Sequence, residues 1–236
     1  MKMIETHTIL LTAAPRSGST LICKLLNQLP NVVILDQPLS GDKIVRLRGD
    51  DFLYAFNHKL ADFRTMIHTE KKIVSVQTGN QFLQHYANEK DEKGLRKRVV
   101  KRGITKIDKY LADDFVMILK SHFLEELQNT EGKVARIIKV ISTFFEKMYP
   151  LLEDGHVIYY EDLIATQGQI LEMVIPQAKN ITEILTNQNS NPLYDHAIMK
   201  LLGQQLLNSE GAFWDFYSKE HVEALIESLD ICEHKI

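Results

Sequence analysis

Cysteine is scarce in this 236-residue sequence, and its two cysteines form no pattern. Cys23 and Cys232 lie near opposite ends of the chain, so they supply neither a disulfide framework nor the spacing of a metal site. We therefore expect no metal, and a protein of the reducing cytoplasm. Cys23 falls within a predicted helix, where we expect it to pack as a small apolar residue.

The sequence also lacks a long apolar run and an excess of positive charge. No stretch of about 18 apolar residues occurs, so we expect no membrane span. Residues 1–7 are too polar and too short for a signal peptide before the first strand, so we expect none. The formal net charge of −3 and the pI of about 6.3 give no support to nucleic-acid binding.

Apolar content and length are sufficient for a folded protein. Hydrophobic residues make up 44% of the chain, which favours a folded protein over a disordered one, and 236 residues suffice for one domain with a full core. We expect a single α/β domain over residues 1–236, with a central parallel sheet flanked by helices. The expected strands cover residues 8–12, 31–35, 115–119 and 155–160, with a possible strand at 72–76. The expected helices cover residues 20–28, most of 50–86, the highly charged segment 88–109, then 134–152 and 219–229.

The most informative segment is Pro-Arg-Ser-Gly-Ser-Thr, residues 15–20, between the first strand and the first helix. A strand, a small-residue turn and a helix in this order direct backbone N–H groups and a helix N-terminus at one spot, which favours phosphate binding. Arg16 adds a positive charge, and Gly18 allows a ligand to approach the backbone closely. Further donors are the hydroxyls of Ser17, Ser19 and Thr20.

Two other interpretations of this loop remain open. The nucleotide-kinase loop reads G-x-x-x-x-G-K-[ST], whereas here Gly18 stands alone and no lysine follows it. An ATP-dependent phosphotransferase would also need an acidic magnesium ligand, for which Asp162 is a weak candidate. Alternatively, the segment is an ordinary turn at a strand–helix junction, where Gly and Ser are common for geometric reasons.

A second polar segment, Lys120-Ser121-His122, follows the expected strand 115–119. Active sites of α/β proteins form at the carboxyl ends of such strands. A neutral imidazole can accept a proton near its ordinary pKa, so His122 is a candidate general base. Asp36, in the expected loop after the second strand, is the alternative base. The plainer interpretation makes His122 a strand-end residue bonded to a loop carbonyl, and Lys120 a solvated residue.

Three segments together resemble the PAPS-dependent sulfotransferases, where PAPS is 3′-phosphoadenosine 5′-phosphosulfate. Residues 15–20 resemble the 5′-phosphosulfate loop of that family, and Lys120-Ser121-His122 resembles its Lys-Thr-His segment. Residues 159–163, Tyr-Tyr-Glu-Asp-Leu, resemble its Tyr-Glu-Asp-Leu segment. The resemblance implies a P-loop-like fold and transfer of a sulfuryl group from PAPS to a hydroxyl or amine of a small acceptor, leaving adenosine 3′,5′-bisphosphate.

The resemblance also implies roles for single residues. His122 would take the acceptor proton, Lys120 would hold the acceptor and the transferring group, and Arg16 would offset charge on the leaving nucleotide. The loop residues, Arg16 included, would bind the cofactor at its 5′ end. Tyr160 would approach the adenine, although Asp162 as a helix cap and tyrosines packed in a sheet explain the same segment.

The 3′-phosphate of the cofactor has only weak candidates. The family uses an Arg eight residues before a Ser, whereas here Arg136 precedes Ser142 by six. At about 3.6 residues per turn, Lys139 shares more of the Ser142 face of a continuous helix than Arg136 does. Solvated cations are an equal interpretation, and a non-catalytic nucleotide-binding or interaction domain of the same fold is the alternative that this weakness favours.

Overall fold

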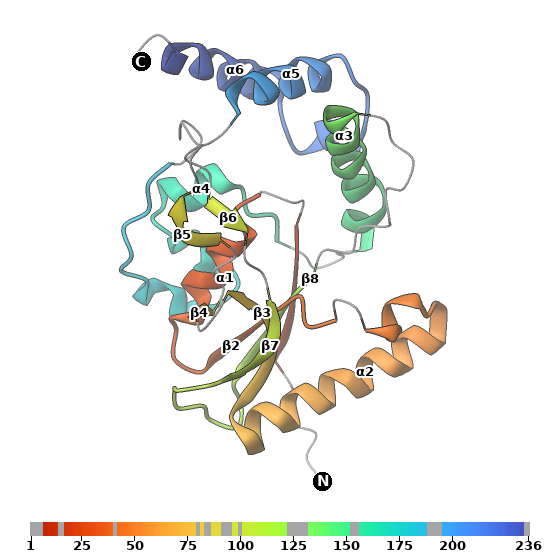
Figure 1. Cartoon of the computed structure of the whole chain (residues 1–236), viewed down its shortest axis with the longest axis vertical. Coiled ribbons are helices and arrows are strands. Elements are labelled where there is room, and N and C mark those ends of the chain that lie inside the picture. The colour runs from red at the N-terminus through yellow and green to blue at the C-terminus, as the bar shows by residue number, and fades with distance from the viewer. Residues whose placement is uncertain are drawn as a thin grey trace. The chain divides into compact units, whose positions relative to one another are not determined.

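The computed structural model describes residues 7–13, 17–39, 42–78, 81–82, 86–90, 96–98, 101–121, 132–151, 156–187 and 195–233. The chain divides into two compact units (Figure 1). The first unit comprises Met1–His122 and Ile158–Ile184, and the second comprises Phe123–Val157 and Leu185–Ile236. The expectation of a single domain stays a prediction.

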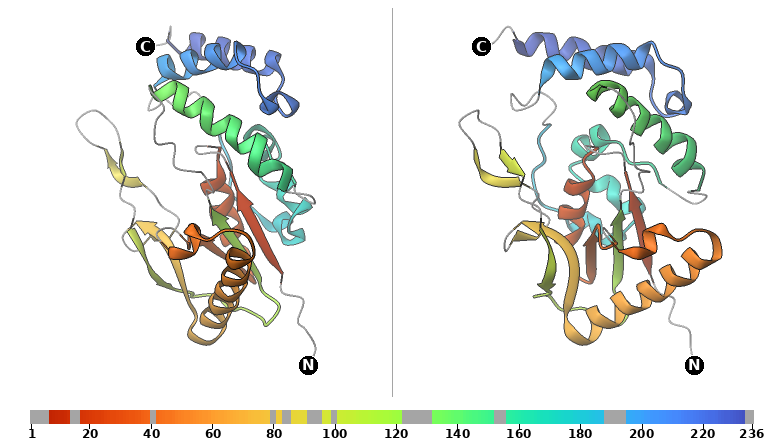
Figure 2. Two further views of the ribbon diagram at one scale, coloured as in Figure 1. Left: turned by 90° about the vertical axis from the view of Figure 1, so that its right-hand side faces the viewer. Right: turned by 45° about the vertical axis from the view of Figure 1, so that its right-hand side comes forward.

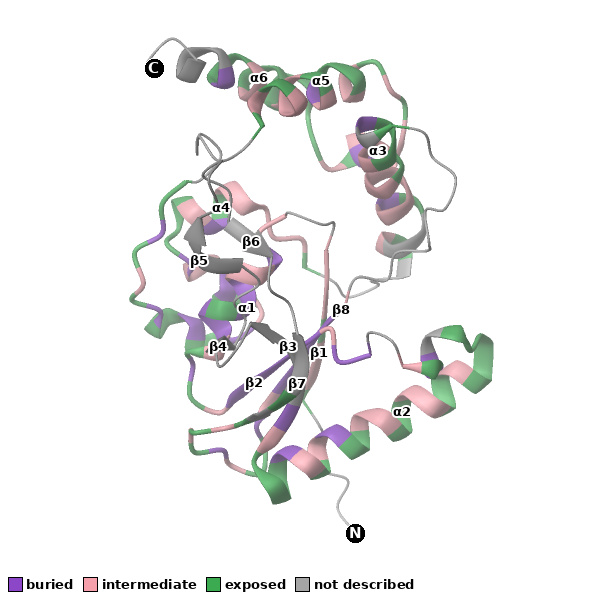
Figure 3. Cartoon of the chain, viewed as in Figure 1, coloured by how far each residue is buried: buried purple, intermediate pink, exposed green. Residues whose placement is uncertain are grey.

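The first unit is an α/β structure around a three-stranded parallel sheet of order β1-β8-β2. Its strands are β1 (Thr8–Thr12), β8 (Val116–Ser121) and β2 (Val32–Asp36). All of β2 and the four central residues of β8 are buried, as Figure 3 shows in purple. Burial on both faces explains why these segments are continuous apolar runs, and the three strands predicted here are confirmed within one or two residues at each end.

Helices flank this sheet on both faces (Figure 2). Alternate residues of a strand point to opposite faces. Val33, Leu35, Met117 and Leu119 share one buried cluster with Phe63 of helix α2 (Gly49–Thr65). Lys120 points to the other face and donates to Thr20 of helix α1 (Ser19–Asn27). The two helices therefore cover opposite faces, and short helical turns η1 (Lys43–Arg46) and η2 (Met66–Glu70) flank α2.

The C-terminal end of α1 is closed by a lysine from a distant part of the chain. Lys109 Nζ donates to the carbonyl oxygens of Asn27, at 2.7 Å, and Leu29, at 3.1 Å. Asn27 is the last residue of α1 and Leu29 follows its C-cap, and a lysine donor is favourable at this end of a helix. The half-buried Lys109 thus fixes the end of α1 that lies opposite the predicted loop.

Where the structure describes the charged segment 88–109 it contains strands and no helix, so that prediction is wrong there. Strands β3 (Lys72–Thr78), β4 (Gln81–Phe82) and β7 (Lys101–Lys106) form an antiparallel sheet of order β4-β3-β7. Strands β5 (Tyr86–Lys90) and β6 (Arg96–Arg98) pair separately. High charge indicates exposure to solvent, which an edge strand such as β7 satisfies as well as a helix does. The possible strand at 72–76 is confirmed and continues to Thr78.

The strand expected at 155–160 is also wrong where the structure describes it. Residues 156–159 join no sheet, and helix α4 (Tyr160–Ala165) begins at the last expected strand residue. Tyr159, the residue before α4, is extended, with φ −80° and ψ 145°. Glu161 and Asp162 then occupy the first helical turn, where negative charge is favourable. Short turns η5 (Gln169–Met173) and η6 (Pro176–Asn180) follow.

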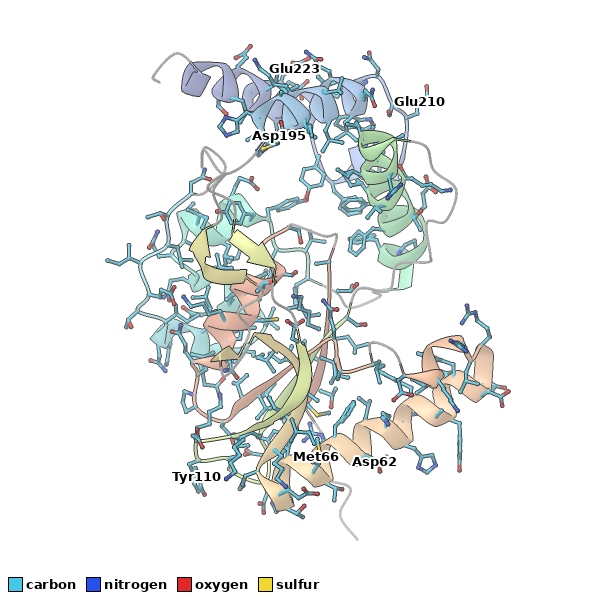
Figure 4. All side chains as sticks on the ribbon, viewed as in Figure 1. Asp62, Met66, Tyr110, Asp195, Glu210 and Glu223 are labelled. Carbon is cyan, nitrogen blue, oxygen red and sulfur yellow. The ribbon has the colours of Figure 1, made fainter. Side chains whose placement is uncertain are left out.

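The second unit is helical where it is described. Helix α3 (Lys133–Thr143) continues through η3 (Phe144–Met148) and η4 (Tyr149–Leu151), which confirms the helix predicted at 134–152 as far as the structure describes it. Helix α5 (His196–Leu207) is capped by Asp195, labelled in Figure 4, whose side chain accepts from Ile198 N at 3.1 Å. Turn η7 (Ala212–Asp215) and the predicted final helix, α6 (Lys219–Glu233), complete the unit. In the described part of the chain, no helix is long and apolar enough to span a membrane.

Candidate functional site

The first unit brings together several of the predicted site residues. Ser17, Gly18, Ser19 and Thr20 stand at the start of α1, Lys120 ends the buried part of β8, and Tyr160 begins α4. Arg16 and His122 lie outside the described residues, so their roles stay predictions. The site is therefore built below from the residues around the N-terminus of α1.

The N-terminus of α1 has no side-chain cap. Its N-cap residue is Gly18, with φ 81° and ψ 1°, a left-handed conformation that glycine adopts without strain. Ser, Thr, Asp or Asn at this position would place an oxygen on the N–H groups of the first turn, and glycine places none. The carbonyl of Gly18 accepts the first helical bond, from Ile22 N at 3.1 Å. The first turn thus offers backbone donors to an anion.

Tyr160 packs directly against this turn. A Cβ atom added to Gly18 would lie 2.8 Å from Cδ2 of Tyr160, which is far inside van der Waals contact. Gly18 is therefore required both by its backbone conformation and by the ring beside it. The resemblance placed these two residues at the same cofactor, and the structure places them in contact, although they come from distant parts of the chain.

A buried ion pair lies on the α1 face of the sheet. Asp36 of β2 and Lys120 of β8 are direct partners in the parallel register. Lys120 Nζ lies 3.2 Å from Asp36 Oδ1, and the two side chains are 1% and 0% exposed. This contact is coulombic, because its geometry is not that of a hydrogen bond. Lys120 Nζ also donates to Thr20 Oγ1 at 3.0 Å.

These contacts correct two expectations. Lys120 is not a solvated strand-end residue, since its side chain is 1% exposed. Asp36 is not in a loop after the second strand but ends the strand itself, buried and paired, so it is not placed to act as an alternative base. Sequence reasoning missed the pair. The available signal was a charged residue at the end of each of two continuous apolar runs.

Cys23 lies beside this pair without contributing reactivity. Burial raises the pKa of its thiol to about 12; the charge of Lys120 lowers the pKa and that of Asp36 raises it, each by less than burial does. The thiol is protonated at neutral pH and is a poor nucleophile. The prediction that Cys23 is a buried, small apolar residue is confirmed.

The candidates for the 3′-phosphate, Arg136 and Ser142, both belong to α3 in the second unit. Ser142 and Lys139 line one hollow of about 510 Å³, and Arg136 does not line it. The sequence spacing predicted this sharing of a face. The other lining residues come from α3 and from the segment at the end of α5: Ala135, Ile138, Gln205, Asn208 and Ser209.

Comparison with known proteins finds no family model, no curated protein and no solved structure that matches this chain.

Proposed function

We propose that this protein is a P-loop-like sulfotransferase that moves a sulfuryl group from PAPS to a hydroxyl or amine of a small acceptor. The observation that carries the proposal is the uncapped N-terminus of α1 behind Gly18, with the ring of Tyr160 against it. A group of phosphate charge suits this turn, because the backbone donors of the first turn converge there.

The start of α1 gives each neighbouring residue a task in this proposal. The 5′-phosphosulfate of bound PAPS supplies the activated sulfuryl group. The first-turn N–H groups and the hydroxyls hold its oxygens, while Arg16 offsets the negative charge that gathers on the leaving phosphate. Tyr160 lies on the Gly18 turn and offers an aromatic face or edge to the adenine.

His122 is the proposed general base. As the acceptor oxygen bonds to sulfur, the bond between sulfur and the phosphate oxygen breaks, and the acceptor proton passes to the imidazole. In the sequence His122 directly follows β8, whose last residue is Ser121. The 3′-phosphate ligands that the resemblance implies, Arg136 and Ser142, belong to α3 of the second unit and stay predictions.

A thermal-shift titration tests the ligand class. We expect adenosine 3′,5′-bisphosphate to raise the melting temperature, and ATP with magnesium to have little effect. At about a hundredfold excess over Kd, mass action adds about 2.7 kcal/mol to the free energy of unfolding, which is easily measured. The same titration on the Arg16→Ala variant should give a smaller rise in melting temperature than on the wild type.

The other outcomes separate the alternatives. Stabilisation by ATP with magnesium alone, abolished by EDTA, would identify a phosphotransferase. Stabilisation by the bisphosphate without turnover of PAPS across a panel of phenols, alcohols and amines would identify a non-catalytic nucleotide-binding domain. If an acceptor is found, His122→Ala should lower turnover by roughly 10²- to 10⁴-fold while leaving nucleotide affinity unchanged.

A further inference from the structure

Among the described residues, the side chains of Thr20 and Asp36 contact the buried ammonium of Lys120. Its side chain is 1% exposed, and it contacts Thr20 Oγ1 at 3.0 Å and Asp36 Oδ1 at 3.2 Å. An ammonium carries three donors and no acceptor. Lys120 therefore donates to Thr20 and cannot receive the Thr20 proton.

Because Lys120 is the donor in this hydrogen bond, the Thr20 hydroxyl can donate its own proton only to another group. A hydroxyl has one donor and two acceptor positions. Because one acceptor position is taken by Lys120, the Thr20 proton points away from the ammonium. Thr20 is the second residue of α1 and belongs to the same uncapped first turn as the backbone donors described above.

Asp36 accounts for the charge of Lys120. A lone ammonium in the core is costly to desolvate, and a carboxylate at 3.2 Å offsets that cost. The same carboxylate neutralises the ammonium, so Lys120 adds little net field at the start of α1. A lysine that bound the ligand directly would need its charge exposed to the ligand.

We propose that Lys120 is a positioning residue, which orients the Thr20 hydroxyl so that its proton is donated to the anionic 5′ group of the ligand, with Asp36 holding Lys120 in place. This inference rests on the proposed function, and it differs from the direct contact with acceptor and transferring group that the family resemblance implies for Lys120. The oriented Thr20 hydroxyl would favour ligands that place a hydrogen-bond acceptor oxygen at the start of α1.

A double-mutant cycle on binding tests the inference. The variants are Thr20→Val, the charge-neutral pair Lys120→Met with Asp36→Asn, and the triple variant, with circular dichroism as a check of folding. Isothermal titration measures Kd for adenosine 3′,5′-bisphosphate and for adenosine 3′-monophosphate, which lacks the 5′ group. Thr20→Ser, which keeps the hydroxyl, is the matched control.

We expect Thr20→Val and the charge-neutral pair each to weaken bisphosphate binding by about tenfold to a hundredfold. The triple variant should lose no more than Thr20→Val alone, because Lys120 acts through Thr20. Binding of the 3′-monophosphate should stay within about threefold throughout, whereas a general loss of structure would weaken both ligands. Thr20→Ser should bind the bisphosphate like the wild type.

Other results overturn the inference in distinguishable ways. If the wild type binds the bisphosphate and the losses in the triple variant are additive, Lys120 contacts the ligand independently of Thr20, and only the positioning role fails. If the wild type binds neither the bisphosphate nor inorganic sulfate, the proposed function and the positioning role fail together. If it binds sulfate but no nucleotide, the same cycle on sulfate affinity decides the positioning role alone.

Discussion

Gly18 and Tyr160 lie so close together that a methyl group on Gly18 would sit 2.8 Å from Cδ2 of the tyrosine ring. The ring therefore touches the backbone at the point where α1 begins. Because Tyr160 is the first residue of α4, the contact ties the starts of two helices to each other. The geometry of the turn thus depends on a residue far along the chain.

Replacement of Gly18 should show this dependence. Gly18→Ala meets both a left-handed φ of 81° and the Tyr160 ring, whereas Gly49→Ala meets a left-handed φ of 55° and open space. Backbone strain at a positive φ costs about 1–2 kcal/mol, and overpacking adds about 1–3 kcal/mol. We expect Gly18→Ala to lower the free energy of unfolding by at least about 1 kcal/mol more than Gly49→Ala, measured by urea denaturation. Addition of Tyr160→Ala should remove most of the excess, and equal losses at the two glycines would contradict the contact.

The buried ion pair predicts that removal of one charge lowers the free energy of unfolding more than removal of both charges. Lys120→Met leaves the carboxylate of Asp36, which is 0% exposed, without its countercharge, and such a loss costs about 3–5 kcal/mol. Lys120→Met combined with Asp36→Asn removes both charges, so the double variant should be more stable than the single one. Chemical denaturation of the three proteins measures the difference. A double variant no more stable than Lys120→Met would show that the pair is not coupled.

Cys23 should resist thiol reagents while the protein is folded. At pH 8, a pKa of about 12 in place of 9.0 lowers the thiolate fraction by roughly a thousandfold. The measurement is the alkylation rate in a Cys232→Ser variant, so that only one thiol is followed. Unfolding in guanidinium should restore the ordinary rate. Rapid alkylation of the native protein would mean that the α1 face of the sheet opens readily.

The lowered pKa of Lys109 predicts that its contribution to the free energy of unfolding rises with pH, whereas the contribution of a cation in an ion pair falls. Burial lowers its pKa from 10.5 to about 8, so between these values the unfolded chain binds more protons than the folded protein does. The contribution of Lys109 to stability should therefore rise as pH increases from 8 to 10.5. A neutral amine keeps two N–H donors, which suffice for Asn27 and Leu29.

The measurement for Lys109 is the difference in free energy of unfolding between wild type and Lys109→Met across this range. Titration of Cys23 occurs in both proteins and cancels in the difference. A difference that stays constant from pH 8 to 10.5 would show that Lys109 keeps its ordinary pKa in the fold.

Local patterns in the sequence predict the first unit's sheet well. The apolar runs that became β2 and β8 are buried on both faces, and such burial leaves a continuous signal in each strand. The third run became β1, which is only partly buried. The spacing of Lys139 and Ser142 on one helix predicts that they share a face, because that periodicity is also local. The helix prediction for 88–109 was wrong because β7 pairs with residues 72–77 of β3, and a local sequence window does not include those residues.

In the candidate site, too, features set by local sequence could be predicted, and features set by the pairing of distant segments could not. Residues 17–20 can be predicted from the strand–turn–helix order, but the Asp36–Lys120 pair depends on the register between β2 and β8. Register is a relation between two strands that neither strand's sequence specifies by itself. Tyr160 was linked to the loop only by the family resemblance, and its contact with Gly18 requires the fold.

Two lysines from one stretch of chain, Lys109 and Lys120, bind opposite ends of α1: Lys120 through Thr20 in the first turn, and Lys109 through the last carbonyls. These hydrogen bonds hold the nine-residue helix at both ends, so a shift along its axis or a rotation about it would strain them. An anion that bound there, as we propose, would therefore meet donors whose directions are already set, and little entropy would be lost in ordering them. Rigidity of this kind favours discrimination between anions by shape as well as by charge.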